Sequence, residues 1–332
     1  MILITGGLGF IGSHIVIELI QKNYQVVIID NLKNSKLNVL YKIKEIVKEK
    51  DFKLVYYCFD IKDEEQLNKV FLENKIDYVI HCAGLKAVGE SVKNPLLYYH
   101  ENINITLSLL KIMEKNNCYH LVFSSSATVY GNQSVPMNEK QSIGQGITNP
   151  YGQTKFFIEQ ILMDLVKSNP KWYITSLRYF NPIGAHPSGL IGEDPNDIPN
   201  NLMPYLLKVA NGTFPHLNIY GNDYNTFDGT GERDYIHVMD LAHAHYKAIV
   251  FQNKGYQFYN IGTGKSTSVL TLINSFQQIN NININYQITN RRDGDLPIVY
   301  CDTNKAEKCI CFKAKYDINQ MVKDSWNFIK NN

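Results

Sequence analysis

The sequence predicts an α/β protein built on a doubly wound parallel sheet, followed by a smaller, mixed α/β C-terminal domain. Short apolar runs alternate with longer amphipathic stretches through the first half of the chain, which is the pattern of βαβ units. The runs are nearly continuous in apolar residues, as strands covered on both faces require. After Phe180 the chain becomes rich in Pro, Gly, Asn and Asp, which indicates a second domain.

A series of predicted strands accounts for the sheet. They are Ile2–Thr5, Gln25–Asp30, Lys53–Phe59, Tyr78–Cys82, His120–Ser124 and Ile174–Tyr179. Helical patterns lie between them at Ser13–Lys22, Glu64–Asn74 and Ile105–Lys115, and later at Leu202–Ala210 and Val238–Phe251. We place the first domain at residues 1–181 and the second at 182–332. The boundary is interleaved, because Phe258–Ile261 is typical of a strand that returns to the first sheet.

Composition excludes several classes of protein. With 332 residues, of which 44% are hydrophobic, the chain can bury the cores of two globular domains. A net charge of +2 gives no basis for binding nucleic acid or an anionic membrane, and no apolar run is long enough to span a bilayer. Because the chain opens directly on the strand pattern Met1–Thr5, we expect no signal peptide. The six cysteines form no C-x-x-C pair and mostly occupy apolar stretches, so we expect a reducing, cytoplasmic setting and no metal site.

A glycine-rich turn near the N-terminus predicts a Rossmann-type dinucleotide site. Gly6, Gly9 and Gly12 follow the first strand and open the first helix. Glycines here allow a tight turn and let backbone amides and the positive helix end approach a pyrophosphate. The spacing is G-x-x-G-x-x-G rather than G-x-G-x-x-G, and the plain alternative is a turn that only caps a strand. Asp30 ends the second strand where an acid binds a ribose diol, which favours NAD over NADP because a carboxylate repels a 2′-phosphate.

Two further strand ends indicate the same cofactor site. Asp60-Ile61 ends the third strand and is expected to touch adenine, although Asp60 also suits the N-cap of the following helix. Cys82-Ala83-Gly84-Leu85-Lys86 ends the fourth strand, where Gly84 permits close approach to the cofactor.

Tyr151 and Lys155 form the predicted catalytic pair. They are four positions apart and therefore share one face of a helix, downstream of a serine-rich strand end, Ser124–Ser126. To act as a base near neutral pH, the tyrosine needs a lowered pKa, which the lysine ammonium and a positive nicotinamide ring favour. Ser126 is expected to orient the same substrate hydroxyl. A lone Y-x-x-x-K is commonly surface packing, so the prediction depends on the glycine turn and the serines.

Longer motifs run through essentially the whole chain. They are Thr5–Gly12, Asp30-Asn31, Ala83–Ser91, Ser124–Gly131, Tyr151–Lys155, Arg178–Pro182, Gly192–Pro195, Ile198–Pro204, Gly221–Tyr224, Asp228–Gly231 and Arg233–Val238. Together they resemble the extended short-chain dehydrogenase/reductase superfamily and, within it, the UDP-glucose 4-epimerase family. The resemblance implies an isomerase of galactose metabolism that interconverts UDP-galactose and UDP-glucose through a 4-keto sugar. In that chemistry Tyr151 removes the proton of the 4-hydroxyl, while hydride passes to bound NAD and returns to the other face.

The resemblance also completes the predicted sites. For NAD it adds Phe10, Ile11, Asn31, Asn34, Ser35, Asn102, Ser124 and Phe180 to the residues above, with Tyr151 and Lys155. For a UDP-hexose it implies Lys86, Ser126, Tyr151, Asn181, Asn201, Leu202, Asn218, Ile219, Tyr220, Arg233, Arg292, Asp295 and Val299. Asn218, Ile219 and Tyr220 would flank uracil. Arg233 and Arg292 would meet the diphosphate, with Asp295 on the ribose; without the resemblance the arginines are ordinary surface charges.

Some positions of the sequence, compared with the family pattern, bear on which reaction and which substrates to expect. Dehydratases of this fold carry an acidic pair where this chain has Ala127 and Thr128, which disfavours dehydration. Val299 stands where some family members place a crowding tyrosine, so we expect room for N-acetylated UDP-hexoses. The alternative enzyme is another NAD-dependent sugar-nucleotide oxidoreductase or a 5-epimerase, and a non-enzymatic NAD sensor is a third reading. Net consumption of NAD(P)⁺ marks the oxidoreductase, and sensors commonly lack the Tyr/Lys pair. The family is usually a homodimer, whose face the stretches Asn102–Glu114 and Tyr151–Val166 would supply.

Overall fold

The computed structural model describes residues 1–196, 199, 201–292 and 294–332, and Ile198 and Asn200 of the motif Ile198–Pro204 lie outside them. Seven strands form one sheet: β1 (Ile2–Thr5), β2 (Val26–Ile29), β3 (Leu54–Tyr57), β4 (Tyr78–His81), β5 (His120–Ser126), β6 (Tyr173–Tyr179) and β11 (Gly255–Ile261). Their order is β11-β6-β5-β4-β1-β2-β3, and every pair is parallel. The prediction of a doubly wound parallel sheet is confirmed.

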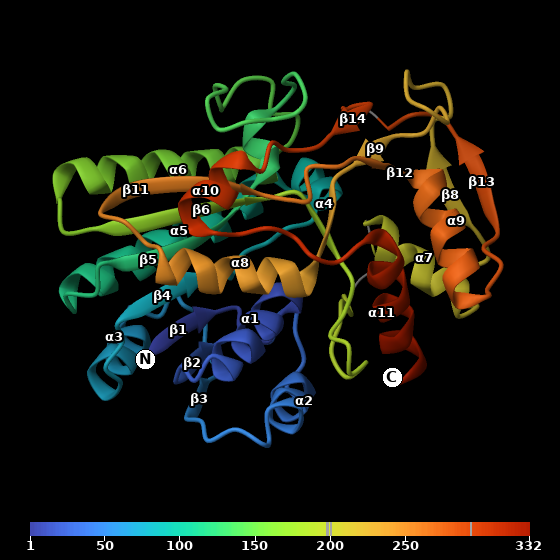
Figure 1. Cartoon of the computed structure of the whole chain (residues 1–332). Helices are drawn as coiled ribbons and strands as arrows, with labels where there is room; N and C mark the ends of the chain where they lie inside the picture. Colours follow the sequence, from blue (N-terminus) through green and yellow to red (C-terminus); the bar gives the residue numbers. More distant parts are fainter. Residues whose placement is uncertain (197–198, 200, 293) are drawn as a thin grey trace.

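Helices cover both faces of this sheet (Figure 1). One face carries α1 (Phe10–Gln21), α2 (Asn38–Ile46) and α8 (Val238–Val250), and the other carries α3 (Glu64–Glu73), α5 (Pro95–Lys115) and α6 (Pro150–Ser168). Side chains alternate across each strand, so Ile2 and Ile4 enter the first core and Leu3 enters the second. Two buried faces explain why these strands are apolar at nearly every position.

The order of the chain and the order in space are interleaved. β11 comes from the second half of the sequence, yet it pairs with β6 from Gly255↔Tyr173 to Ile261↔Tyr179. The preceding helix α8 packs beside α1 on the same sheet. The edge of the sheet is therefore completed only after the C-terminal part of the molecule has begun.

The C-terminal part is smaller and lies to the right in Figure 1. Its core is surrounded by α7 (Leu202–Ala210), β8 (Leu217–Tyr220), α9 (Val269–Asn280), β13 (Tyr286–Thr289) and α11 (Ile318–Lys330). Short strands form the sheets β12-β9-β14 (Thr267–Ser268, Glu232–Arg233, Ile298–Val299) and β10-β7 (Tyr235–His237, Asn181–Ile183). The remaining helices are α4 (Val88–Lys93), the 3₁₀ turn η1 (Ala127–Tyr130) and α10 (Asn304–Ile310).

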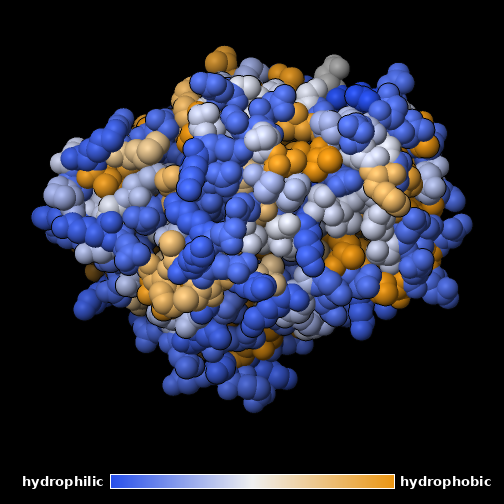
Figure 2. All heavy atoms as spheres, turned by 45° about the horizontal axis from the view of Figure 1, so that its top comes forward, coloured by the Kyte–Doolittle hydropathy of each residue, from blue (hydrophilic) through white to orange (hydrophobic). Residues whose placement is uncertain are grey.

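The surface is mostly hydrophilic on the face shown in Figure 2, with separate hydrophobic patches. Within the described ranges, none of the helices combines the length and the apolar character that crossing a bilayer requires.

Candidate active site

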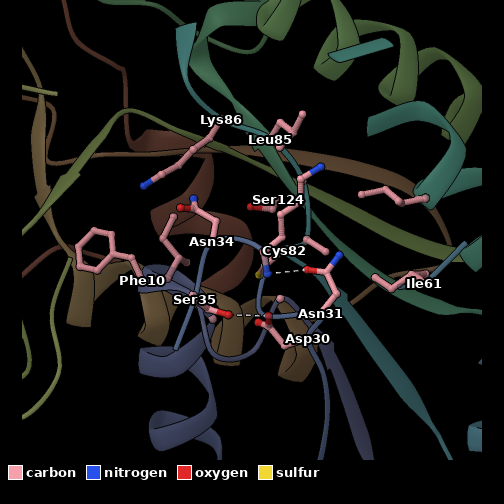
Figure 3. Close-up of a pocket in the computed structure, with 18 of the residues that line it drawn as sticks. Phe10, Asp30, Asn31, Asn34, Ser35, Ile61, Cys82, Leu85, Lys86 and Ser124 are labelled. Atoms are coloured by element: carbon pink, nitrogen blue, oxygen red, sulfur yellow. Dashed lines mark hydrogen bonds between the residues drawn. The ribbon is translucent and has the colours of Figure 1, made fainter. Parts of the chain in front are cut away.

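A pocket opens where the carboxyl ends of the sheet strands face the C-terminal part, the place at which doubly wound sheets bind ligands (Figure 3). It contains most of the residues predicted for the cofactor. They are Gly6, Gly9, Phe10, Ile11, Gly12, Asp30, Asn31, Asn34, Ser35, Asp60, Ile61, Cys82, Ala83, Gly84, Lys86 and Ser124. The ends of five neighbouring strands thus supply one continuous lining.

The glycine turn requires its glycines. Gly6 has φ +68°, and a Cβ there would lie 2.9 Å from the backbone nitrogen of Ala83. A Cβ on Gly12 would lie 2.1 Å from the carbonyl oxygen of Gly6, so the first turn of α1 packs directly on the loop. In the described structure, no side chain caps the N-terminus of α1, and its first turn contains no acidic residue. Its amides, which have no intrahelical acceptor, remain available to an anion.

Asp30 fastens this turn to the end of β2. Its Oδ2 accepts the backbone N–H of Leu8 at 3.0 Å. Its Oδ1 accepts the N–H of Leu32 at 3.0 Å and the hydroxyl of Ser35 at 2.6 Å (Figure 3). The carboxylate is largely buried but still lines the pocket. A glycine turn with open amides and a fixed carboxylate one strand away fit the pyrophosphate and the ribose diol of NAD.

The predicted catalytic residues lie at the end of β5 and on the first turns of α6. Ser126 is the last residue of β5, and Tyr151 is the second residue of α6. One turn later, Nζ of Lys155 donates to the backbone oxygen of Ser124 at 2.7 Å. The same Nζ lies 5.8 Å from the ring centroid of Tyr151. The structure therefore brings the serine strand end, the tyrosine and the lysine together.

Burial controls the protonation of this pair. It raises the pKa of the Tyr151 phenol, and a hydrogen bond with Ser126 acts in the opposite direction. It lowers the pKa of Lys155 to about 8, while Cys82 and Glu159 oppose that lowering. The Lys155 ammonium donates to the Ser124 carbonyl oxygen and lies over the face of the Tyr151 ring. The hydrogen bond with Ser126 and the positive charge of Lys155 beside the ring both act in favour of the phenolate.

Charged groups of the C-terminal part gather around β9. β14 pairs with β9 so that Val299 lies opposite Arg233. Nη1 of Arg233 donates to the backbone oxygen of Leu296 at 2.8 Å, and Nη2 lies 3.5 Å from Oδ1 of Asp295. Val299 packs against the cluster that contains Phe180, the residue after β6. Arg233, Asp295 and Val299 are therefore neighbours and adjoin the end of the parallel sheet.

The side chains of the residues predicted to flank uracil alternate between the buried and the half-buried face of β8. Asn218 and Tyr220 are half-buried, and the guanidinium carbon of Arg292 lies 3.9 Å from the Tyr220 ring centroid. The side chain of Ile219 is buried in the C-terminal core, so only its backbone can face a base. Asn181 on β7 and Asn201 before α7 are exposed, and Leu202 begins α7.

Asn102 has a structural task that the sequence did not reveal. Its Oδ1 accepts the N–H of Leu85 at 2.8 Å, and its Nδ2 donates to the Leu85 oxygen and to Thr154 Oγ1, both at 3.0 Å. The side chain is buried. Of the residues predicted to bind NAD, the described pocket lining does not include Asn102, Tyr151, Lys155 and Phe180. Asn102 therefore holds the loop after β4 against α6.

Two groups of residues escaped the sequence analysis. Glu193, Asp194 and Pro195 line the pocket, and Glu193 Oε1 pairs with Nζ of Lys86 at 2.6 Å. Behind the site, Glu159 and Arg178 form a buried bidentate pair, with Nε–Oε1 at 3.0 Å and Nη2–Oε2 at 2.7 Å. Glu159 lies one turn after Lys155 on α6, which is the signal that could have found it. The motif Gly192–Pro195 was visible in the sequence without an assigned role.

Comparison with known proteins gives a consistent family. The model of the NAD dependent epimerase/dehydratase family matches residues 2–262. The UDP-glucose 4-epimerase of Haemophilus influenzae is 50% identical, over 100% of this chain and 98% of the relative. UDP-glucose 4-epimerase 2 of Arabidopsis thaliana is 49% identical, over 100% and 95%. The crystal structure of the Bifidobacterium longum UDP-glucose 4-epimerase in complex with NAD⁺ and UDP has a TM-score of 0.95 and 48% identity, over 100% and 98%.

The match extends over both parts of the chain, so it includes the glycine turn, the Tyr151/Lys155 pair and the groups around Arg233. The chain belongs to the NAD dependent epimerase/dehydratase family and, within it, to the UDP-glucose 4-epimerases of the extended short-chain dehydrogenase/reductase type.

Proposed function

We infer that this protein is a UDP-glucose 4-epimerase, an isomerase that interconverts UDP-galactose and UDP-glucose and so serves galactose metabolism. The observation that carries this conclusion is the Tyr151/Lys155 pair, in which Lys155 is bonded to the Ser124 that lines the dinucleotide pocket, within a chain that matches 4-epimerases over its full length. Bound NAD would supply a reversible hydride acceptor for carbon 4 of the hexose, so the reaction would have no net redox change.

The protein groups have separate tasks in this proposal. Tyr151 exchanges the proton of the 4-hydroxyl, and Ser126 donates a hydrogen bond that favours the phenolate. Lys155, held by the Ser124 carbonyl, places a positive charge beside the tyrosine and the cofactor pocket. Glycine-turn amides and Asp30 hold the pyrophosphate and the adenosine ribose.

We assign the UDP part of the substrate to the C-terminal groups. Arg233 is already ordered by Leu296 and Asp295, so its free N–H groups can meet phosphate oxygens with little loss of side-chain entropy. Arg292 stacked on Tyr220, together with Asn218, offers a planar surface with polar edges for uracil or its ribose. Asn181, Asn201 and Leu202 would line the side nearer the hexose.

Dehydration is disfavoured by the residues of η1. Ala127 and Thr128 stand where the dehydratases of this fold carry acids, and neither side chain can transfer the protons that loss of water requires. Another NAD-dependent sugar-nucleotide oxidoreductase or epimerase is the remaining alternative, and it is distinguished by its products.

We further propose that N-acetylated UDP-hexoses are substrates. Val299 is small, half-buried and opposite Arg233 on the neighbouring strand, where a larger residue would crowd the hexose. Turnover of UDP-N-acetylgalactosamine at a rate comparable with UDP-galactose supports this; no turnover while UDP-galactose reacts overturns it.

A homodimer is also part of the proposal. The exposed apolar stripe, which we define as Val92, Leu96, Leu107 and Phe157, runs along α4, α5 and α6 with 59%, 81%, 43% and 41% of each residue exposed. Several exposed apolar side chains on neighbouring helices are typical of a protein–protein interface. Leu107 and Phe157 lie within the two stretches from which the sequence predicted a dimer.

The test of the function is direct. Purified protein is incubated with UDP-galactose, with and without added NAD, and the sugar anomeric protons are followed by NMR. We expect UDP-glucose to appear in both samples, because a cofactor that is never consumed can stay bound. No conversion even with added NAD would exclude the 4-epimerase.

A further inference from the structure

The hydroxyl of Ser126 receives two hydrogen bonds from one residue, Thr128. The backbone N–H of Thr128 donates to Oγ of Ser126 at 3.2 Å, which makes Ser126 the N-cap of η1. The Thr128 hydroxyl lies 3.0 Å from the same oxygen. Within the described part of the chain, the Thr128 side chain has no other hydrogen-bond partner, so its proton has Ser126 Oγ as its acceptor.

These two bonds decide what Ser126 can still do. A serine hydroxyl has one proton and two lone pairs. When Thr128 occupies both lone pairs, the proton of Ser126 is left to donate elsewhere. The candidate acceptor is the Tyr151 phenol, which precedes the Gly152 that Thr128 packs against and whose pKa Ser126 lowers. Ser126 is therefore held as a donor, the form that supports a phenolate or an oxyanion but cannot accept the substrate proton.

Thr128 is itself fixed by the catalytic helix. A Cβ on Gly152, the residue after Tyr151, would lie 3.1 Å from both Cβ and Oγ1 of Thr128. Thr128 thus fills the space between the first turn of α6 and the end of β5. Its position depends on the same helix that carries Tyr151, so the donor and the phenol are held in register.

We propose that Thr128 is a positioning residue of the 4-epimerase reaction, which holds Ser126 as a hydrogen-bond donor toward Tyr151 and the 4-oxygen of the sugar. The proposal rests on the epimerase function inferred above. It gives Tyr151 alone the task of taking the proton. It also gives a reason why a threonine, and not only a small residue, occupies the second position of η1.

Two matched variants separate the hydroxyl of Thr128 from its shape. Thr128→Val keeps the branched side chain and removes the hydroxyl, whereas Thr128→Ser keeps the hydroxyl and removes the methyl group. Loss of one orienting hydrogen bond predicts a fall in kcat of roughly 3- to 10-fold for Thr128→Val. We expect the acidic, ascending limb of its pH–kcat profile to move to higher pH, because the phenolate loses its donor and the pKa of Tyr151 rises. The KM for UDP-galactose should change by less than about twofold, because Arg233 and the uracil site bind UDP.

The variant Thr128→Ser should lose less activity than Thr128→Val and keep the pH profile of the natural protein. The same pair is also made in a Ser126→Ala background, where Thr128→Val should have no further effect on kcat if it acts through Ser126. NAD content and thermal melting confirm that each variant is folded.

The outcomes separate the two hypotheses. If the natural protein does not convert UDP-galactose, the epimerase function fails. If the natural protein is active and Thr128→Val matches it in kcat and pH profile, the role of Thr128 is overturned. It is equally overturned if both variants slow the reaction alike without moving the pH profile, or if Thr128→Val has the same effect with and without Ser126. If Thr128→Val does not fold, Thr128→Ser with a changed pH profile overturns the proposal, and with an unchanged profile supports it.

Discussion

Tyr151 illustrates how much of the chemistry depends on single side chains. Burial raises the pKa of its phenol, so the phenolate must be favoured by neighbours. Ser126 supplies a hydrogen bond, and Lys155 supplies a positive charge that the Ser124 carbonyl fixes in place. The pair could be predicted from its spacing, but the direction in which the lysine points could not, because that depends on where β5 ends.

The role of Tyr151 gives the first prediction. Tyr151→Phe keeps the ring and the packing but removes the proton-transferring oxygen, so kcat should fall by roughly 10²–10⁴ while the fold and bound NAD are retained. Turnover is measured by NMR beside NAD release on denaturation. Near-normal turnover in this variant would contradict the proton transfer assigned to Tyr151.

Val299 gives a second prediction at this scale. Val299→Tyr should lower kcat/KM for UDP-N-acetylgalactosamine by at least about tenfold more than for UDP-galactose, because a ring opposite Arg233 takes the space of the 2-substituent. Val299→Ala is the matched control and should keep both substrates. If the ratio of kcat/KM for the two substrates is unchanged in Val299→Tyr, this position does not control specificity.

At the scale of elements, the catalytic helix α6 is attached to the sheet by a buried polar network. Glu159 accepts from Arg178 on β6 and from Ser125 on β5 at 2.5 Å. Arg178 also donates to the hydroxyl of Tyr130 at 2.9 Å, which donates to Asn260 on β11 at 2.7 Å. The network joins the elements that carry Ser126 and Tyr151.

Breaking the buried Glu159–Arg178 ion pair should lower the stability of the protein. Glu159→Gln leaves the buried Arg178 charge without its partner, so the free energy of unfolding should fall by about 3–5 kcal/mol. The control is Asp164→Asn on the same helix, whose pair with Lys167 is exposed, and it should cost about 1 kcal/mol or less. Denaturant unfolding compares the two. Equal losses would mean that the network does not hold α6.

Elements differ in how far the sequence predicts them. The strands and the glycine turn have local signals, namely continuous apolar runs and glycines at fixed spacing. The side of β8 that Ile219 takes is set by packing of α7 and α9, which no local pattern reports. Likewise Glu193 meets Lys86 across 107 positions of sequence, and Asn102 is drawn into the loop at Leu85. Such contacts appear only when the two parts of the molecule are assembled.

At the scale of the whole molecule, buried neutral histidines link stability to pH. Burial lowers the pKa of four of them from 6.5, to about 3 for His14 and His81 and to about 4 for His186 and His245. Below pH 6.5 the unfolded chain binds protons that the native protein does not. The free energy of unfolding should therefore fall as the pH drops from 6.5 toward 4, by at most about 1.4 kcal/mol per pH unit for each histidine.

Urea unfolding at pH 7.5, 6 and 5 measures this slope. Asp234 and Asp240 oppose the trend, because burial raises their pKa, but the histidines outnumber them. A free energy of unfolding that is unchanged between pH 7.5 and pH 5 would contradict the prediction.

The exposed apolar stripe predicts the assembly. Leu107→Asp combined with Phe157→Asp places charges at the proposed interface, so light scattering should report a monomer for this variant and the proposed dimer for the natural protein. Tyr41→Asp on α2 is the control, because its residue is 63% exposed on the opposite face of the sheet. The interface proposal fails if the double variant keeps the mass of the natural protein.

The central claim is that hydrogen leaves carbon 4 and returns to it without net oxidation. UDP-galactose carrying deuterium at carbon 4 of the galactose is incubated with the protein in ordinary water, with no added cofactor. We expect UDP-glucose that retains the deuterium at carbon 4. We also expect that the absorbance at 340 nm shows no NADH accumulating in proportion to the UDP-glucose formed. Loss of the label to water, or an oxidised sugar formed with net consumption of NAD⁺, would contradict it.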